Sequence, residues 1–350
     1  MTTHPVTRQG QEGQHPDREA MTGVQAGKRW RRRGRGEQPT VPDARFTSYY
    51  GKPVINRPVW EPPDIPGYLF LGGLAGASSL LAAGAQLTGR PDLERGAKTG
   101  ALAAATVSLV ALVHDLGKPA RFVNMLRTFK VTSPMSVGSW LLGGYVPAAA
   151  AACASALTGR MPRTGAAATA GAALLGPGVA SYTAALISDT AVPSWHDGFR
   201  EMPFVFVGSA ATAAGGLGMV AAPVDQAEPA RNLALLGVAT ELVAAKLMER
   251  RIGLSAEPYH HGRGGAYMKA GQALSAIGLA GALLGARTRS RALAAGAGAA
   301  FLAASAVTRW GIFHAGMQSA DDPKYTVIPQ RERLEARKRE SCADADGGGL

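Results

Sequence analysis

The densest group of reactive side chains in this 350-residue chain lies between residues 114 and 140. Asp115 is followed closely by Lys118 and Arg121, and Gly117 and Pro119 between them favour a turn. A carboxylate beside two cations can form charge-assisted hydrogen bonds, so we expect a folded loop here. The candidate site residues of this segment are His114, Asp115, Lys118, Arg121, Ser136, Ser139 and Trp140.

A structural explanation of the same segment stays open. In a membrane protein, Trp140 would belong to the aromatic belt, and the basic side chains would contact lipid headgroups. The segment would then be an interfacial cap without any chemistry of its own.

Glu241 is the second residue that could carry chemistry, because it lies near the middle of a long apolar stretch. A carboxylate is costly inside a bilayer and is normally paired or protonated there. We expect a proton relay, while a protonated Glu241 bonded to a neighbouring helix carbonyl stays open. Arg309 and His314 are expected at a docking face at the end of the last apolar stretch, outside the core.

Metal and haem ligands are not suitably placed in the sequence. The two cysteines, Cys153 and Cys342, lie far apart, and an iron–sulfur cluster of the ferredoxin type needs four. We therefore expect no metal site, no iron–sulfur cluster and no haem in this chain. The histidines fall in tails, in loops or at helix ends: His4, His15, His114, His196, His260, His261 and His314.

The elements that must position these residues are long apolar stretches. The chain is 46% hydrophobic and 18% charged, which excludes a disordered protein. Each stretch is long enough to cross a ~30 Å hydrocarbon core, and none shows the polar face of a soluble helix. We expect an all-α membrane protein, a bundle of about eight transmembrane helices near residues 65–87, 97–113, 137–157, 166–187, 204–222, 232–248, 269–286 and 292–313.

The connections alternate between short and long, so one face of the bundle carries the long loops and both ends of the chain. That face also carries the basic run at residues 28–35 and basic residues of the C-terminal tail, although Arg287, Arg289 and Arg291 lie on the opposite side. The positive-inside rule then predicts cytoplasmic termini in a multi-pass protein of the inner or plasma membrane. The expected divisions are a disordered basic tail at 1–47, the helical domain at 48–316 and a polar tail at 317–350.

The segment from Asp115 to Trp140 resembles a family signature, D-L-G-[RK]-P-x-R-F, then M-L, then S-P-M-S-x-G-S-W. It is the signature of the NrfD/PsrC family, the integral-membrane subunits of complex iron–sulfur molybdoenzymes. Residues 68–76, 182–188, 193–195 and 202–206 agree with this family. Residues 49–54 and 322–327 resemble motifs of its actinobacterial branch, so the resemblance covers about 49–333.

This resemblance implies a subunit that exchanges electrons between membrane quinone, such as menaquinone, and a ferredoxin-like four-cluster iron–sulfur partner. That partner would connect it to a molybdopterin catalytic subunit, so this chain would hold a quinone site and no catalytic centre. No nucleic-acid partner is expected. The implied quinone pocket combines the candidates of residues 114–140 with Tyr145 one to two turns deeper and with Gly72 and Gly73 on the opposite helix.

Two other classes of function remain. The first is a transporter or proton-translocating module without redox partners, although transporters favour inverted repeats and the sequence has no second copy of the motif at residues 115–140. The second is a structural anchor without quinone.

Overall fold

The computed structural model describes residues 54–347 apart from 57, 61 and 116–123. Every regular element in this part of the chain is a helix, and no strand occurs in it. The helices are α2 (Asp64–Leu87), α3 (Pro91–Asp115), α5 (Pro134–Thr158), α6 (Pro162–Ser188), α7 (Pro193–His196), α8 (Met202–Ala221), α9 (Glu228–Ile252), the 3-10 helix η3 (Gly253–Tyr259), α10 (Gly262–Thr288), α11 (Arg291–Asp321) and α12 (Lys324–Gly347).

Local sequence signals set several of these boundaries. The Ser133 hydroxyl accepts a hydrogen bond from the Ser136 amide and caps α5, and Ser290 caps α11 in the same way through Leu293. Proline stands in the first turn of α5, α6 and α8, where its missing N–H costs nothing. Gly159 ends α5 with φ +67°, a conformation that favours glycine.

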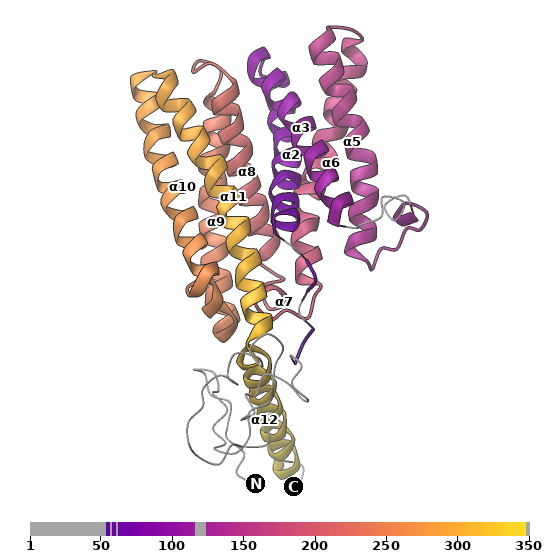
Figure 1. Cartoon of the computed structure of the whole chain (residues 1–350), viewed down its shortest axis with the longest axis vertical. Helices are drawn as coiled ribbons and strands as arrows, with labels where there is room; N and C mark the ends of the chain where they lie inside the picture. Colours follow the sequence, from indigo (N-terminus) through magenta and orange to yellow (C-terminus); the bar gives the residue numbers. More distant parts are fainter. Residues whose placement is uncertain (1–53, 57, 61, 116–123, 348–350) are drawn as a thin grey trace, which may run out of the picture.

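The long helices run antiparallel and stand side by side (Figure 1). The short connections 88–90, 159–161, 222–227 and 289–290 meet at one end, here called the short-loop face. The opposite end, the long-loop face, carries α7 and η3. Figure 1 shows α5 and α6 at one side of the bundle, α10 and α11 at the other, and α12 extending past the long-loop face.

Small residues allow the helices to approach closely, as their abundance in the sequence predicts. A Cβ added to Gly76 of α2 would overlap the Gly176 carbonyl of α6, and a Cβ added to Gly176 would overlap the Gly76 carbonyl. Gly216 of α8 and Gly298 of α11 make the same reciprocal contact. Backbones this close gain dispersion contacts where lipid supplies no hydrophobic drive between helices.

Six of the described helices are long and apolar enough to cross a membrane, namely α2, α3, α5, α6, α8 and α11. The expected all-α membrane protein is thus confirmed, whereas the count of eight spans is not. Three long helices of the described part of the chain lie outside this set. They are α9, whose mean hydropathy is lowered by Glu241 and by charges at both ends, α10, which has Arg263 and Lys269 in its first turns, and the polar α12 beyond the bundle.

Only some of the predicted domain limits can be compared with the helix boundaries of the structure. The tail expected at residues 1–47 lies outside the described residues. At the other limit, α11 continues to Asp321, and the polar tail expected from residue 317 is helical as α12.

Candidate functional site

The motif segment joins the long-loop ends of α3 and α5. His114 and the half-buried Asp115 are the last residues of α3, and the His114 Nδ1 atom lies 2.6 Å from the carboxylate of Asp64 at the start of α2. Lys118 and Arg121 lie outside the described residues. The structure therefore adds Asp64 to the candidates, which the sequence had not indicated because it stands in a different polar segment.

The next three candidates hold the entry of α5 in place. The Ser136 hydroxyl accepts from the Lys130 amide and donates to the Thr128 carbonyl, each at 3.0 Å. Ser139 is buried and donates to the Met135 carbonyl of its own helix at 2.9 Å. Trp140 is exposed and lies edge-on to Phe129, with ring centroids 6.0 Å apart. Ser136 and Trp140 therefore stabilise the loop, and Ser139 alone of the three is buried.

Tyr145 is fully buried and lies deeper in the bundle, away from Trp140. Its hydroxyl donates to the Ala75 carbonyl of α2 and lies 2.8 Å from the Ser79 hydroxyl. Gly72 faces the Ser108 hydroxyl of α3, while Gly73 faces Ala210 and the guanidinium of Arg309. The structure thus brings Tyr145 to helix α2 as expected, but it directs the two glycines toward different neighbours.

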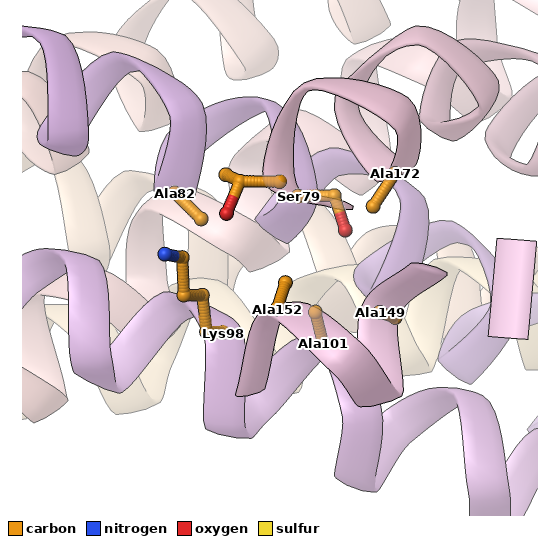
Figure 2. A pocket seen from close by; sticks show the side chains of 8 residues that line it. Ser79, Ala82, Lys98, Ala101, Ala149, Ala152 and Ala172 are labelled. Carbon is orange, nitrogen blue, oxygen red and sulfur yellow. The ribbon is translucent and has the colours of Figure 1, made fainter. Parts of the chain in front are cut away.

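A small cavity of about 10 Å³ lies between Ser79 and Lys98 (Figure 2). Lys98 is buried, and its ammonium group hydrogen-bonds to Glu94 and to Gln86 near the short-loop face. A volume of this size holds about one water molecule. The remaining lining residues are Ala82, Ala101, Ala149, Ala152, Thr169 and Ala172.

Tyr182 of α6 brings two of the motif stretches together. A Cβ on Gly138 would overlap the Tyr182 ring. The Tyr68 ring of α2 lies edge-on to the Tyr182 ring, with ring centroids 6.4 Å apart. The buried Tyr182 hydroxyl has no hydrogen-bond partner in the described part of the chain. Buried polar groups are nearly always satisfied, so a donor of this kind marks a place for a further polar group.

Glu241 of α9 lies opposite a buried arginine. Its carboxyl group interacts with the guanidinium of Arg309 and with the hydroxyl groups of Thr308 and Ser209. Arg309 is fully buried, donates to the Phe206 carbonyl at 2.7 Å and lies 3.7 Å from the centre of the Phe206 ring. Its Nε and Nη1 atoms have no hydrogen-bond partner among the described residues.

The expectation that Arg309 sits at a docking face is therefore wrong. At 1.5 Å per residue, Arg309 and Glu241 both lie roughly 17 Å from the long-loop ends of α11 and α9. The sequence did not indicate this pair, because the predicted spans end at residues 248 and 313 and would leave Arg309 close to the end of its helix. An arginine placed so deep is stabilised by the opposite charge and by the aromatic face of Phe206.

The long-loop face near α7 and η3 is held by specific hydrogen bonds. The Ser194 hydroxyl donates to the Ser255 carbonyl, and the Tyr259 hydroxyl donates to the Ser194 carbonyl, both at 2.9 Å. Burial raises the pKa of Tyr259, so this hydroxyl stays a neutral donor. At the edge, Arg251 pairs with Glu201, and the hydrogen bond from Arg251 lowers the pKa of Glu201. The buried hydrogen bonds therefore join α7 to η3, and the ion pair lies at the edge of this contact.

No group of three or more His, Cys, Asp or Glu side chains that could hold a metal occurs among the described residues. The absence of haem and of iron–sulfur clusters stays a prediction.

Comparison with protein families matches residues 54–261 to the family described as Polysulphide reductase, NrfD. The match covers more than half of the chain, includes the segment 115–140, and ends just before α10. A search of curated proteins finds no match. Members of the matched family are membrane subunits of oxidoreductase complexes, and helices such as α2 and α8 give this chain the character of a multi-pass membrane protein. The chain belongs to the NrfD family of polysulphide reductase membrane subunits.

Proposed function

We propose that this protein is the membrane anchor and quinone-interacting subunit of an iron–sulfur and molybdopterin oxidoreductase. It passes electrons between the membrane quinone pool and a ferredoxin-like four-cluster subunit. The observation that carries the proposal is the family match over residues 54–261, which contains the whole segment 115–140.

The proposed quinone site lies at the long-loop ends of α2, α5 and α6. A quinone has two carbonyl oxygens that need donors, and the buried Tyr182 hydroxyl is a donor without a partner in the described residues. Ser139 is buried at the neighbouring position to Gly138, which packs against the Tyr182 ring. These features support the fit of a quinone head group there. When bound, a quinone supplies the two-electron chemistry that the side chains cannot.

Asp115 and His114 are the proposed groups for proton exchange at this site. His114 is exposed and bonded to Asp64, so it is in contact with the aqueous side. Lys118 and Arg121 are proposed to hold the Asp115 carboxylate, and Ser136 and Trp140 to keep the loop in position. Tyr145, Gly72 and Gly73 lie farther inside and are proposed to shape the helix packing behind the site.

Glu241 is proposed as a deeper proton relay. The adjacent Arg309, Thr308 and Ser209 support a carboxyl group that can change protonation, because they stabilise its charged form.

The partner is proposed to dock on the long-loop face, where Arg200, Arg251 and His260 are exposed beside α7 and η3. By the positive-inside rule this face, with both termini, is cytoplasmic. We also propose that α9 and α10 span the plasma membrane with the other six helices, since each is long enough to do so.

Asp115→Asn tests this function in the assembled complex. The amide keeps the size of the side chain but cannot exchange a proton, so quinone-linked turnover should be abolished while dye-linked activity of the partner subunits continues. Asp225→Asn, on the short-loop connection, is the matched control and should leave both activities unchanged. Normal quinone reduction by a well-assembled Asp115→Asn complex would contradict the site.

A second candidate is a proton-translocating module without redox partners, and the interaction of the half-buried Glu241 with the buried Arg309 favours it. The purified subunit in liposomes, without quinone or partner, distinguishes the two. Proton flux that is lost in Glu241→Gln would support translocation, whereas no flux supports the redox subunit.

A further inference from the structure

We propose that α10 and α11 bind the phosphate of an anionic phospholipid at the long-loop end of α10. An open pocket of about 420 Å³ lies there, lined by Arg263, Ala266, Tyr267, Ala270 and His314. Both helices follow the segment matched to the NrfD family, and none of these residues belongs to the proposed quinone site.

The pocket presents groups that suit a phosphate diester. Arg263 is exposed in the first turn of α10, where its guanidinium can form paired hydrogen bonds to phosphate oxygens. One turn farther, Tyr267 stacks on His314 with ring centroids 5.2 Å apart and an angle of 6° between the planes. A guanidinium, a phenol and an imidazole therefore line one opening.

The outer face of α10 continues from this pocket as an apolar stripe. Ala270, Ile277 and Leu284 follow Tyr267 at intervals that keep them on one helix face, and all three are exposed. In Figure 1, α10 stands at the edge of the bundle, beside α11. A polar pocket at the membrane boundary with an apolar stripe leading inward matches a headgroup and its acyl chain.

The openness of the pocket favours a phospholipid over a quinone. A quinone that reacts must be enclosed so that water is excluded, whereas Arg263 and Tyr267 are both exposed. The positive charge of Arg263 also favours an anionic phospholipid. The long-loop face is the proposed cytoplasmic side, where anionic lipids attract basic residues near the surface.

The test measures the lipid retained by the full complex. The complex is reconstituted into nanodiscs of phosphatidylglycerol and phosphatidylcholine, extracted in mild detergent and analysed by native mass spectrometry. We expect retained phosphatidylglycerol to exceed phosphatidylcholine, and Arg263→Gln to lower this excess about fivefold, the effect of one basic residue near a membrane surface. Tyr267→Ala should lower it as well.

Arg287→Gln is the matched control, because Arg287 is exposed at the opposite end of the same helix. It should leave the excess unchanged. Equal retention of the two lipids, an unchanged excess in Arg263→Gln, or an equal loss in Arg287→Gln would overturn the proposal. Retention of quinone in place of phospholipid, lost in Arg263→Gln, would also overturn it. The readout does not depend on turnover, so failure of the proposed quinone function is scored separately.

Discussion

The two halves of the bundle differ in how their buried polar and charged side chains are paired. The first half, α2, α3, α5 and α6, consists of helices that are all apolar enough to cross a membrane, whereas in the second half, α8 to α11, only α8 and α11 are. In the core of the first half, Tyr145 and Ser79 form neutral hydrogen bonds, and the buried Lys98 pairs with Glu94 of its own helix near the short-loop face. In the second half, the half-buried Glu241 of α9 lies opposite the fully buried Arg309 of α11, so the interacting charges come from two different helices.

The difference shows that the mean hydropathy of a helix does not give the free-energy cost of its charges in the folded protein. A charge lowers the mean hydropathy of its own helix, but its cost in the bilayer depends on what other helices place beside it. Each of the charges of Glu241 and Arg309 would be costly to transfer from water into the bilayer alone. In the fold, each charge lowers the free-energy cost of the other. The comparison can be tested by removing one group at a time from each half.

The largest effect is expected from Arg309→Met, which leaves Glu241 without its opposite charge. The variant also removes the hydrogen bond to the Phe206 carbonyl, and a charge left alone near the middle of a bilayer costs about 2.5–3.5 kcal/mol, so the thermal midpoint of the detergent-purified protein should fall steeply. The double variant with Glu241→Gln should recover most of the loss, because no unpaired charge remains. Equal stability of Arg309→Met and wild type would show that the two halves do not differ in this way.

A smaller effect is expected where helices of the first half cross. In Gly76→Ala the new methyl group would overlap the Gly176 carbonyl, and overpacking costs about 1–3 kcal/mol. Gly84→Ala on the same helix is the control, because no atom outside the local helix lies within 4 Å of its Cβ position. The measurement is the difference between the two thermal midpoints. If they coincide, close backbone approach does not limit the stability of this half.

Tyr145→Phe should cost about 1–2 kcal/mol, since it removes two neutral hydrogen bonds, to the Ala75 carbonyl and with the Ser79 hydroxyl, and leaves the ring in place. The same measurement as for Arg309→Met applies. A fall in thermal midpoint as large as that of Arg309→Met would mean that the neutral hydrogen bonds of the first half stabilise the fold as much as the charged groups of the second half.

The smallest effect concerns the long-loop face of the second half, where Arg251 lowers the pKa of Glu201. A carboxyl group whose pKa is lower in the folded state stabilises the fold above its unfolded pKa of about 4.3, and this stabilisation is lost as the pH falls through the folded value. Glu201→Gln should therefore cost less than about 1 kcal/mol at pH 7 and nothing near pH 2. Thermal midpoints measured from pH 7 to pH 2 check this, and a constant difference between variant and wild type would contradict it.

Helix positions were largely predictable from composition, and helix ends were not. The first span was predicted at 65–87, and α2 runs from Asp64 to Leu87. The sixth was predicted at 232–248, but α9 extends from Glu228 to Ile252. A hydropathy pattern stops at charged residues, whereas helical hydrogen bonding continues through Arg250 and Arg251 into the aqueous boundary.

The candidate site was predictable where neighbouring residues act together and not where distant helices meet. Ser136, Ser139 and Trp140 follow one another at the entry of α5, and the sequence alone grouped them. Tyr182 was noted only as part of a resemblance, because its contact with Gly138 joins α6 to α5.

The sequence by itself determined that this chain is an all-helical membrane protein of the NrfD family, because every backbone polar group in a bilayer must be satisfied within its own segment and the family motif is local. Only the tertiary structure decided that Arg309 lies in the core beside Glu241, and that the Tyr182 hydroxyl is buried against α5. The physical reason is that the rotation of a helix about its axis is set by its packing against other helices. The neighbours of each side chain therefore depend on contacts between segments far apart in the chain.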